Sequence, residues 1–164
     1  MKEWANRPPE IAALLNPAFC GFLVSSGLDE YTKNVNEGAP YVFPFVMLPL
    51  ILHKPTRQMF PRSIRTAFSA WITNADTAIA KIGFAERAKS MSPYVKEALA
   101  FAMQHNSIYV TASGRLKTSN QAPKTYPNAS QEVIECVRAA VMCGKWFSMV
   151  GDFKTAMALL GVKP

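Results

Sequence analysis

Apolar residues recur at helical spacing through most of the chain, beginning shortly after the N-terminus. Pro9 suits the first turn of a short helix, because the N–H that proline lacks would be unpaired there. Asn16 and Pro17 then supply an N-cap and a first helical residue for a second helix, which we expect over 17–31. Phe19 lies in the apolar stripe of that helix, so this corner of the chain is predicted to be structural.

The longest apolar run, residues 41–52, is uncharged and has no polar face. A helix that is apolar all round must be buried, and a bilayer span needs about twenty such residues, so we expect a central core helix. Pro44 can begin this helix, whereas Pro49 lies inside the run and should kink the helix or end a turn.

The second half of the chain contains its main β-prone segment. Ser92 and Pro93 are predicted to open a helix over 92–105, which is followed by short strands at 108–111 and 116–118. A helix followed at once by a hairpin with a basic tip is typical of the closing part of a winged helix-turn-helix.

The remaining segments favour helices separated by polar loops. We expect a helix capped by Ser63, a short helix over 76–84, a loop over 120–130 and a last helix capped by Ser130. The predicted fold class is therefore mainly α, with a winged-helix-like element and one short β-hairpin. We expect a single helical domain over 1–164, with the winged-helix-like part at about 41–120.

The chain has 164 residues and a formal net charge of +7, which favours acidic partners such as nucleic acid or the acidic face of a protein. Its cysteines, Cys20, Cys136 and Cys143, are odd in number and form no Cys-x-x-Cys pair, which suits a reducing cytosol. The first residues lack the apolar run of a signal peptide. We therefore expect a cytoplasmic protein that does not contact a membrane.

Candidate catalytic residues are few. His53 and His105 each lie at the end of a predicted helix, where a capping role is more common than catalysis. Cys136 and Cys143 share a helix face but are two turns and about 10 Å apart, too far to chelate one ion. Glycine-rich phosphate-binding loops are absent from the sequence. We expect no enzyme activity, no cofactor and no metal.

Basic residues form two groups that could bind a partner. They are Arg57, Arg62 and Arg65 around one turn, and Arg115, Lys117 and Lys124 on and after the predicted wing. Because Arg57, Arg62 and Arg115 are in predicted turns, we expect their side chains to reach outward. The groups could contact a nucleic-acid backbone, pair with acidic residues of a partner subunit, or form a solvated positive surface.

Base reading by the helix before the predicted wing is disfavoured. Its expected exposed residues include no Arg or Asn of the kind that reads base edges; they are Tyr94, Lys96, Glu97 and Gln104.

Several stretches together resemble the middle component of bacterial three-component ABC systems. They are Arg7-Pro8-Pro9-Glu10 with 14–21, the apolar run 41–53, Arg57 with Phe60-Pro61, and the C-terminal 159–164. These systems encode an ABC ATPase with further subunits and are implicated in defence against phage and other invading DNA.

The resemblance implies a non-catalytic adaptor subunit. Its partners would be an ABC or SMC-like ATPase and other operon-encoded subunits, with DNA reached through the assembled complex, and no catalytic residue carries over. A stand-alone winged-helix DNA-binding regulator is the alternative.

Overall fold

A computed structural model describes residues 7–63, 65–120 and 128–162 of the chain. Within these residues the fold is mainly α with one two-stranded sheet, which confirms the prediction of a mainly α fold with one short β-hairpin. The elements are α1 (Pro9–Leu14), α2 (Pro17–Thr32), α3 (Phe43–Ile51), α4 (Lys54–Gln58), α5 (Phe68–Thr73), the 3-10 helix η2 (Ala75–Lys81), α6 (Phe84–Gln104), β1 (Ile108–Val110), β2 (Leu116–Thr118), α7 (Gln131–Met149) and α8 (Phe153–Leu159).

Helix α2 begins as the sequence predicts. The Asn16 side-chain oxygen accepts a hydrogen bond from the Ala18 N–H at 2.9 Å, and Pro17 is the first helical residue. By length and composition alone, 12–32 is the one stretch of the described residues that could cross a membrane. We assign it to the protein core, because α2 packs against α6, α7 and β2.

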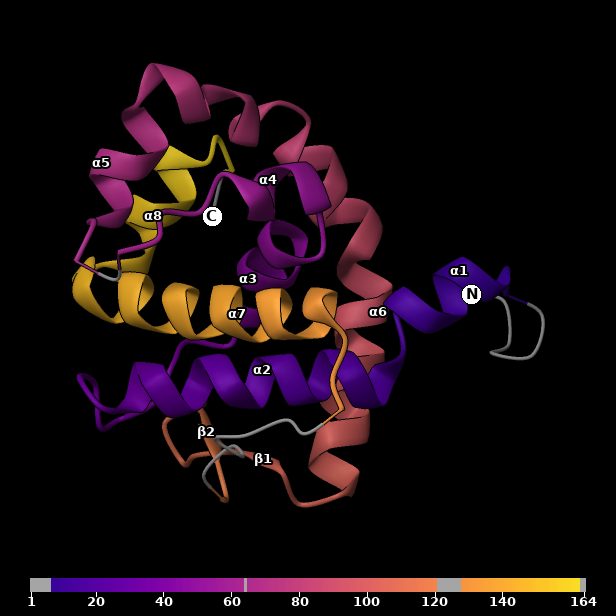
Figure 1. The fold of residues 1–164 in the computed structure, drawn as a ribbon. Helices are drawn as coiled ribbons and strands as arrows, with labels where there is room; N and C mark the ends of the chain where they lie inside the picture. The colour runs from indigo at the N-terminus through magenta and orange to yellow at the C-terminus, as the bar shows by residue number, and fades with distance from the viewer. Residues whose placement is uncertain (1–6, 64, 121–127, 163–164) are drawn as a thin grey trace.

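Helices α2 and α7 lie side by side along much of their length (Figure 1). The contact is close because glycine faces glycine where the two helices meet. A Cβ on Gly144 would collide with the Gly27 carbonyl oxygen, and a Cβ on Gly27 would lie 3.2 Å from the Ala140 carbonyl. The backbones can approach this closely only because neither position carries a side chain.

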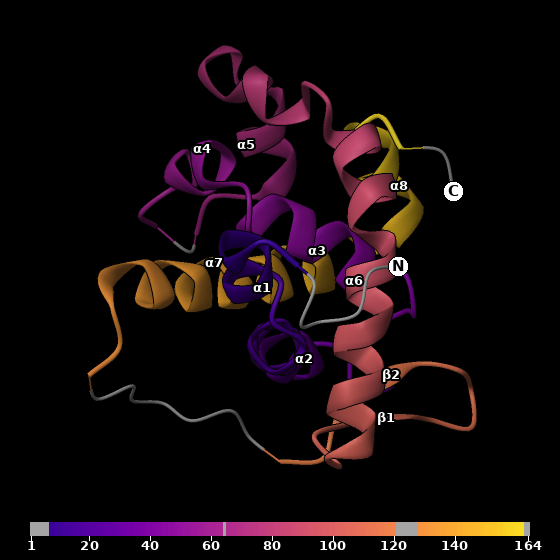
Figure 2. The same cartoon turned by 90° about the vertical axis from the view of Figure 1, so that its right-hand side faces the viewer.

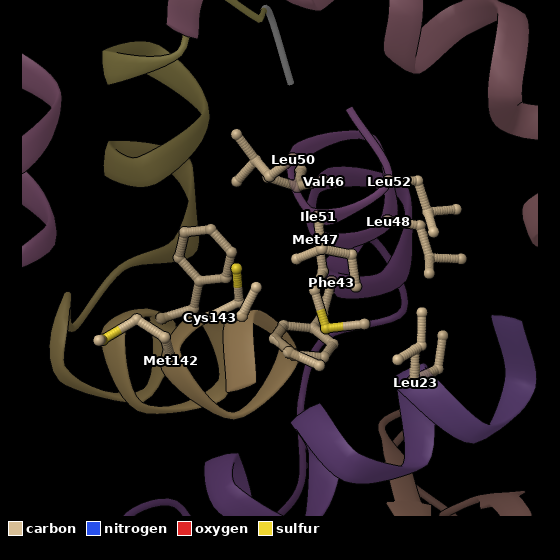
Figure 3. Close-up of a cluster of buried hydrophobic side chains, with 14 of the residues drawn as sticks. Leu23, Phe43, Val46, Met47, Leu48, Leu50, Ile51, Leu52, Met142 and Cys143 are labelled. Carbon is tan, nitrogen blue, oxygen red and sulfur yellow. The ribbon is translucent and has the colours of Figure 1, made fainter. Parts of the chain in front are cut away.

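Helix α3 is the centre of the core, as the apolar run predicts. Phe43, Met47 and Ile51 are fully buried between α2, α6 and α7 (Figure 3). The helix continues past Pro49 and ends at Ile51, two residues later.

Helix α6 differs from the prediction, which placed a helix start at Ser92. It begins at Phe84, after Gly83 in the left-handed conformation, and Pro93 lies inside it. The apolar stripe that includes Phe84, Val95 and Leu99 packs on α2 and α3, whereas Pro93 is exposed. Packing along this stripe outweighs the roughly 3 kcal/mol that an interior proline costs a helix.

The predicted hairpin follows α6. Strand β1 pairs antiparallel with β2, with Val110 opposite Leu116. Leu116 also exchanges two backbone hydrogen bonds with Ala39, at 2.8 and 3.0 Å, and its buried side chain faces α2. Figure 2 shows the hairpin beside the C-terminal end of α6.

Two smaller helices also differ from the sequence-based expectation. Ser63 does not cap a helix: its hydroxyl accepts from the Arg65 N–H at 3.2 Å, and α5 begins only at Phe68. The segment predicted as a helix over 76–84 is a 3-10 helix capped by Asn74, and it ends before Gly83. Short segments of this kind carry little periodic signal, so their boundaries are poorly determined by the sequence.

Candidate partner-binding surface

Helix α7 has one face in the core and one face outward. Ser130 caps it, as predicted, by accepting from the Val133 N–H at 3.3 Å. Cys143 and Phe147 are buried on the inner face, whereas Arg138 and Met149 are exposed. The outer face is therefore open to solvent along a helix that the core holds in place.

The connection between α4 and α5 crosses this helix and is fixed to it by two hydrogen bonds. Arg138 Nη2 donates to the Pro61 carbonyl at 3.3 Å, and the Trp146 indole N–H donates to the Thr66 carbonyl at 2.6 Å. Each bond anchors one part of the connection. The basic residues Arg62 and Arg65, which adjoin Pro61 and Thr66, are therefore held next to α7.

This arrangement brings together cations from two distant parts of the sequence. They are Arg62 and Arg65 from the connection and Arg138 and Lys145 from α7, which we call the α7 basic face. Arg62, Arg65 and Arg138 are exposed and Lys145 is half-buried. Within the described residues none of these four cations is in an ion pair, so their charge is available to an acidic surface.

The expectation that Arg57 reaches outward is wrong. Arg57 is only 5% exposed; its Nη1 donates to the Ile51 carbonyl at 2.7 Å and its Nη2 to Glu132 at 2.8 Å. Glu135 lies 3.9 Å from its Nε. The predicted turn is the short helix α4, which folds Arg57 against the N-terminal end of α7. Arg57 therefore connects parts of the fold, and its carboxylate partner Glu132 lies 75 residues away in the sequence.

The predicted wing does not present its cations at the tip. Arg115 turns back, and its Nη1 donates to the Gly38 carbonyl at 3.1 Å. Lys117 is half-buried, and Lys124 lies outside the described residues. Burial raises the pKa of Tyr31, and the neighbouring Arg115 partly offsets this rise.

The described members of the two predicted basic groups do not meet. Helix α2 lies between the hairpin and α7, so the residues near α7 and those near the hairpin occupy different sides of the molecule (Figure 1). Sequence reasoning identified Arg62 and Arg65 but missed Arg138 and Lys145. These two are spaced seven residues apart on one helix, a signal that the sequence does contain.

Helix α6, which precedes the predicted wing, is partly covered by Arg7 of the N-terminal segment. Arg7 donates two hydrogen bonds to Glu97, at 2.8 and 2.6 Å, and its guanidinium lies 5.2 Å from the centre of the Tyr94 ring. Of the four residues expected to be exposed there, Tyr94 and Glu97 therefore contact the N-terminal segment, while Lys96 and Gln104 are exposed.

The thiols and His53 lie in surroundings that favour their neutral forms. Burial raises the pKa of Cys20 to about 12 and also raises the pKa of Cys143. His53 Nδ1 lies 2.7 Å from the Thr56 hydroxyl, and burial lowers the pKa of this histidine. A search of the described residues finds no group of three His, Cys, Asp or Glu that could hold a metal ion.

The fold and this surface define a mainly helical protein that holds a rigid, positively charged face toward solvent. Residues 4–164 match the model of the family described as ABC-three component (ABC-3C) system Middle Component 3, and the chain belongs to that family. This confirms the resemblance seen in the sequence. The protein is therefore a component of an ABC-3C system and works with other components of that system. Neither the curated proteins nor the solved structures gave a match.

Proposed function

We propose that the chain is a non-catalytic, cytoplasmic adaptor subunit. In this role it links an ABC or SMC-like ATPase to the other components of an ABC-3C system that defends against phage or plasmids. The α7 basic face is the surface through which it contacts an acidic region of its partner.

The observation that carries this proposal is the arrangement of the α7 basic face in a protein that works with other subunits. Two hydrogen bonds fix the connection that holds Arg62 and Arg65. Because the backbone of this connection is already fixed, only the side chains lose freedom when a partner binds, and arginine can bind a carboxylate through two parallel hydrogen bonds. Charge complementarity of this kind speeds association and selects among partners.

Other observations support a role in binding. The raised pKa of Cys20 keeps its thiol protonated at neutral pH, and a protonated thiol is a poor nucleophile. The sequence contains no phosphate-binding loop, so we assign ATP hydrolysis to the ATPase of the system.

The test compares two double charge reversals in chains co-expressed with the ATPase of the same system. Arg62→Glu/Arg138→Glu alters the proposed surface, whereas Lys89→Glu/Lys96→Glu alters the exposed face of α6. We expect the first to weaken the ATPase complex by about tenfold or more and the second to leave it unchanged. Equal binding by both variants, with unchanged melting temperatures, would remove the support for this surface.

The alternative function, a stand-alone winged-helix DNA-binding regulator, is favoured by one observation. Strands β1 and β2 directly follow α6, and β2 pairs in turn with Ala39, which precedes α3. The contacts of Arg7 with Tyr94 and Glu97 on α6 weigh against it.

Salt dependence separates the two functions. A regulator should bind DNA alone, lose affinity by roughly 0.9 log units per log salt for each phosphate contact, and be impaired by Lys89→Glu/Lys96→Glu. An adaptor should co-purify with the ATPase and bind DNA poorly on its own.

A further inference from the structure

A groove of about 530 Å³ lies beside the α7 basic face, between α5, the C-terminal end of α7, and α8. Phe68 and Trp146 line it and are almost completely buried. Arg65, Lys145 and Met149 also line it. The groove thus combines aromatic side chains with cations that belong to the basic face.

The aromatic side chains that line the groove are held in place. The rings of Phe68 and Trp146 lie 5.5 Å apart, and Trp146 stacks on Trp71 at 4.9 Å. The Trp146 indole N–H is already bonded to the Thr66 carbonyl. Because ring packing and this hydrogen bond fix Trp146, the groove is formed before any partner arrives and binding costs little reorganisation.

The charge of the groove differs from that of two other hollows in the described residues. A hollow of about 210 Å³ beside Arg62 and Arg138 also includes Glu135, and one of about 380 Å³ near Arg115 includes Asp152. The groove is lined by Arg65 and Lys145 with no acidic residue. An occupant carrying carboxylates is therefore attracted to the groove without competition from an acidic residue in its lining.

Met149 gives the groove an apolar edge that the described residues leave exposed. Its side chain is 69% exposed, although it follows closely on the buried Phe147 in the same helix. Methionine is flexible and polarisable, and exposed methionines are common on surfaces that bind apolar groups of partners. Burial of this side chain would add hydrophobic stabilisation to the charge attraction.

We propose that this groove is the docking site for an acidic segment of another ABC-3C component. The segment places an apolar side chain against Trp146 and Met149, and its carboxylates pair with Arg65 and Lys145. This inference rests on the proposed function and specifies which chemistry the partner supplies. A second copy of the chain is a poorer occupant, because two molecules of formal net charge +7 repel each other.

Site-specific photo-crosslinking tests which segment occupies the groove. A benzophenone side chain replaces Met149 in the full chain, which is assembled with the purified ATPase and the remaining component of its system. The control carries the same group at Tyr109, an exposed residue on β1. We expect the first probe to label one segment, rich in Asp, Glu and apolar residues, in another component. Labelling of a basic segment, of a second copy of this chain, or of nothing would overturn the proposal.

Variants of the groove provide a second readout. We expect Met149→Asp and Arg65→Glu/Lys145→Glu each to reduce the affinity for the other components by about tenfold, and Met149→Leu to retain it. The melting temperatures should stay close to that of the unaltered chain, because Arg65 and Met149 are exposed and the half-buried Lys145 is in no ion pair within the described residues.

The outcomes separate this inference from the proposed function. If the complex tolerates all groove variants but is lost with Arg62→Glu/Arg138→Glu, the groove assignment is wrong and the adaptor function stands. If the unaltered chain forms no complex with the other components, both are wrong.

Discussion

The two faces of α7 differ in packing and exposure. On the inner face, Gly144 lies against α2 so closely that even a methyl group would collide with the Gly27 carbonyl. On the outer face, Arg138 is exposed and Met149 is among the most exposed apolar side chains of the described residues. One helix thus has an inner side whose residues are constrained by close packing, and an outer side whose residues are largely exposed.

This difference indicates that candidate binding residues of α7 lie on its outer face. Residues on the inner face are explained by packing alone. The exposed Met149 contributes little to the fold, so a substitution there should change binding by other components more than stability. Substitutions on the two faces should therefore separate stability from binding.

The largest loss of stability should follow Phe147→Ala on the inner face. Phe147 is buried and its ring packs against Phe43, Phe68 and Phe153, so we expect the free energy of unfolding to fall by about 3–5 kcal/mol. Urea denaturation measures this loss. The matched control is Met149→Ala on the same helix, which should change stability by less than about 0.5 kcal/mol. Similar losses for both would show that the two faces do not differ.

Gly144→Ala tests the helix crossing and should be the next largest effect. In an open helix this change stabilises by up to about 1 kcal/mol, because alanine has the higher helix propensity. Here the added methyl group meets a backbone oxygen, so we expect a loss of about 3 kcal/mol. Thermal denaturation measures the effect, and we expect the melting temperature to fall. A rise in melting temperature would mean that α2 and α7 can move apart at no cost.

A smaller effect should come from Arg57→Leu. The substitution leaves the Ile51 carbonyl without the donor that binds it at 2.7 Å, and we expect a loss of about 2 kcal/mol in urea denaturation. The half-exposed Glu132 can be hydrated again, which limits the penalty. Arg62→Leu is the control and should stay within about 0.5 kcal/mol. An equal response would place both arginines in the same role.

The smallest change in stability should follow Arg138→Glu/Lys145→Glu on the outer face. Neither cation is in an ion pair within the described residues, and Arg138 makes only one long hydrogen bond, at 3.3 Å. We expect each reversal to alter the free energy of unfolding by about 0.5 kcal/mol or less. A loss above 2 kcal/mol would mean that the outer face also supports the fold.

The parts of the fold that the sequence predicts are those determined by local signals. Asn16 and Pro17 set the start of α2, and the apolar run of residues 41–52 indicates a buried helix without reference to any partner. Phe19, which the sequence places in the apolar stripe of α2, is only half-buried, whereas its neighbour Cys20 is 1% exposed. Pro93 misled the prediction because the packing of α6 against other helices is not visible in its own sequence.

The candidate site was less predictable, because it is built from contacts between distant segments. Arg57 and Arg62 lie five residues apart, and the sequence predicts both to be basic residues in a turn. One is buried against Glu132, and the other is exposed. Arg138 was overlooked because nothing near it in the sequence places the connection after α4 against α7.

Hydroxyl-radical footprinting tests most directly whether the outer face of α7 is the partner surface. It compares the rates of side-chain oxidation in the free chain and in the complex with the other ABC-3C components. Met149 is 69% exposed and Tyr109, on the hairpin, is 43% exposed, so both should be oxidised in the free chain. We predict that complex formation slows the oxidation of Met149 several-fold and leaves that of Tyr109 unchanged. Protection of Tyr109 with continued oxidation of Met149 would contradict this account.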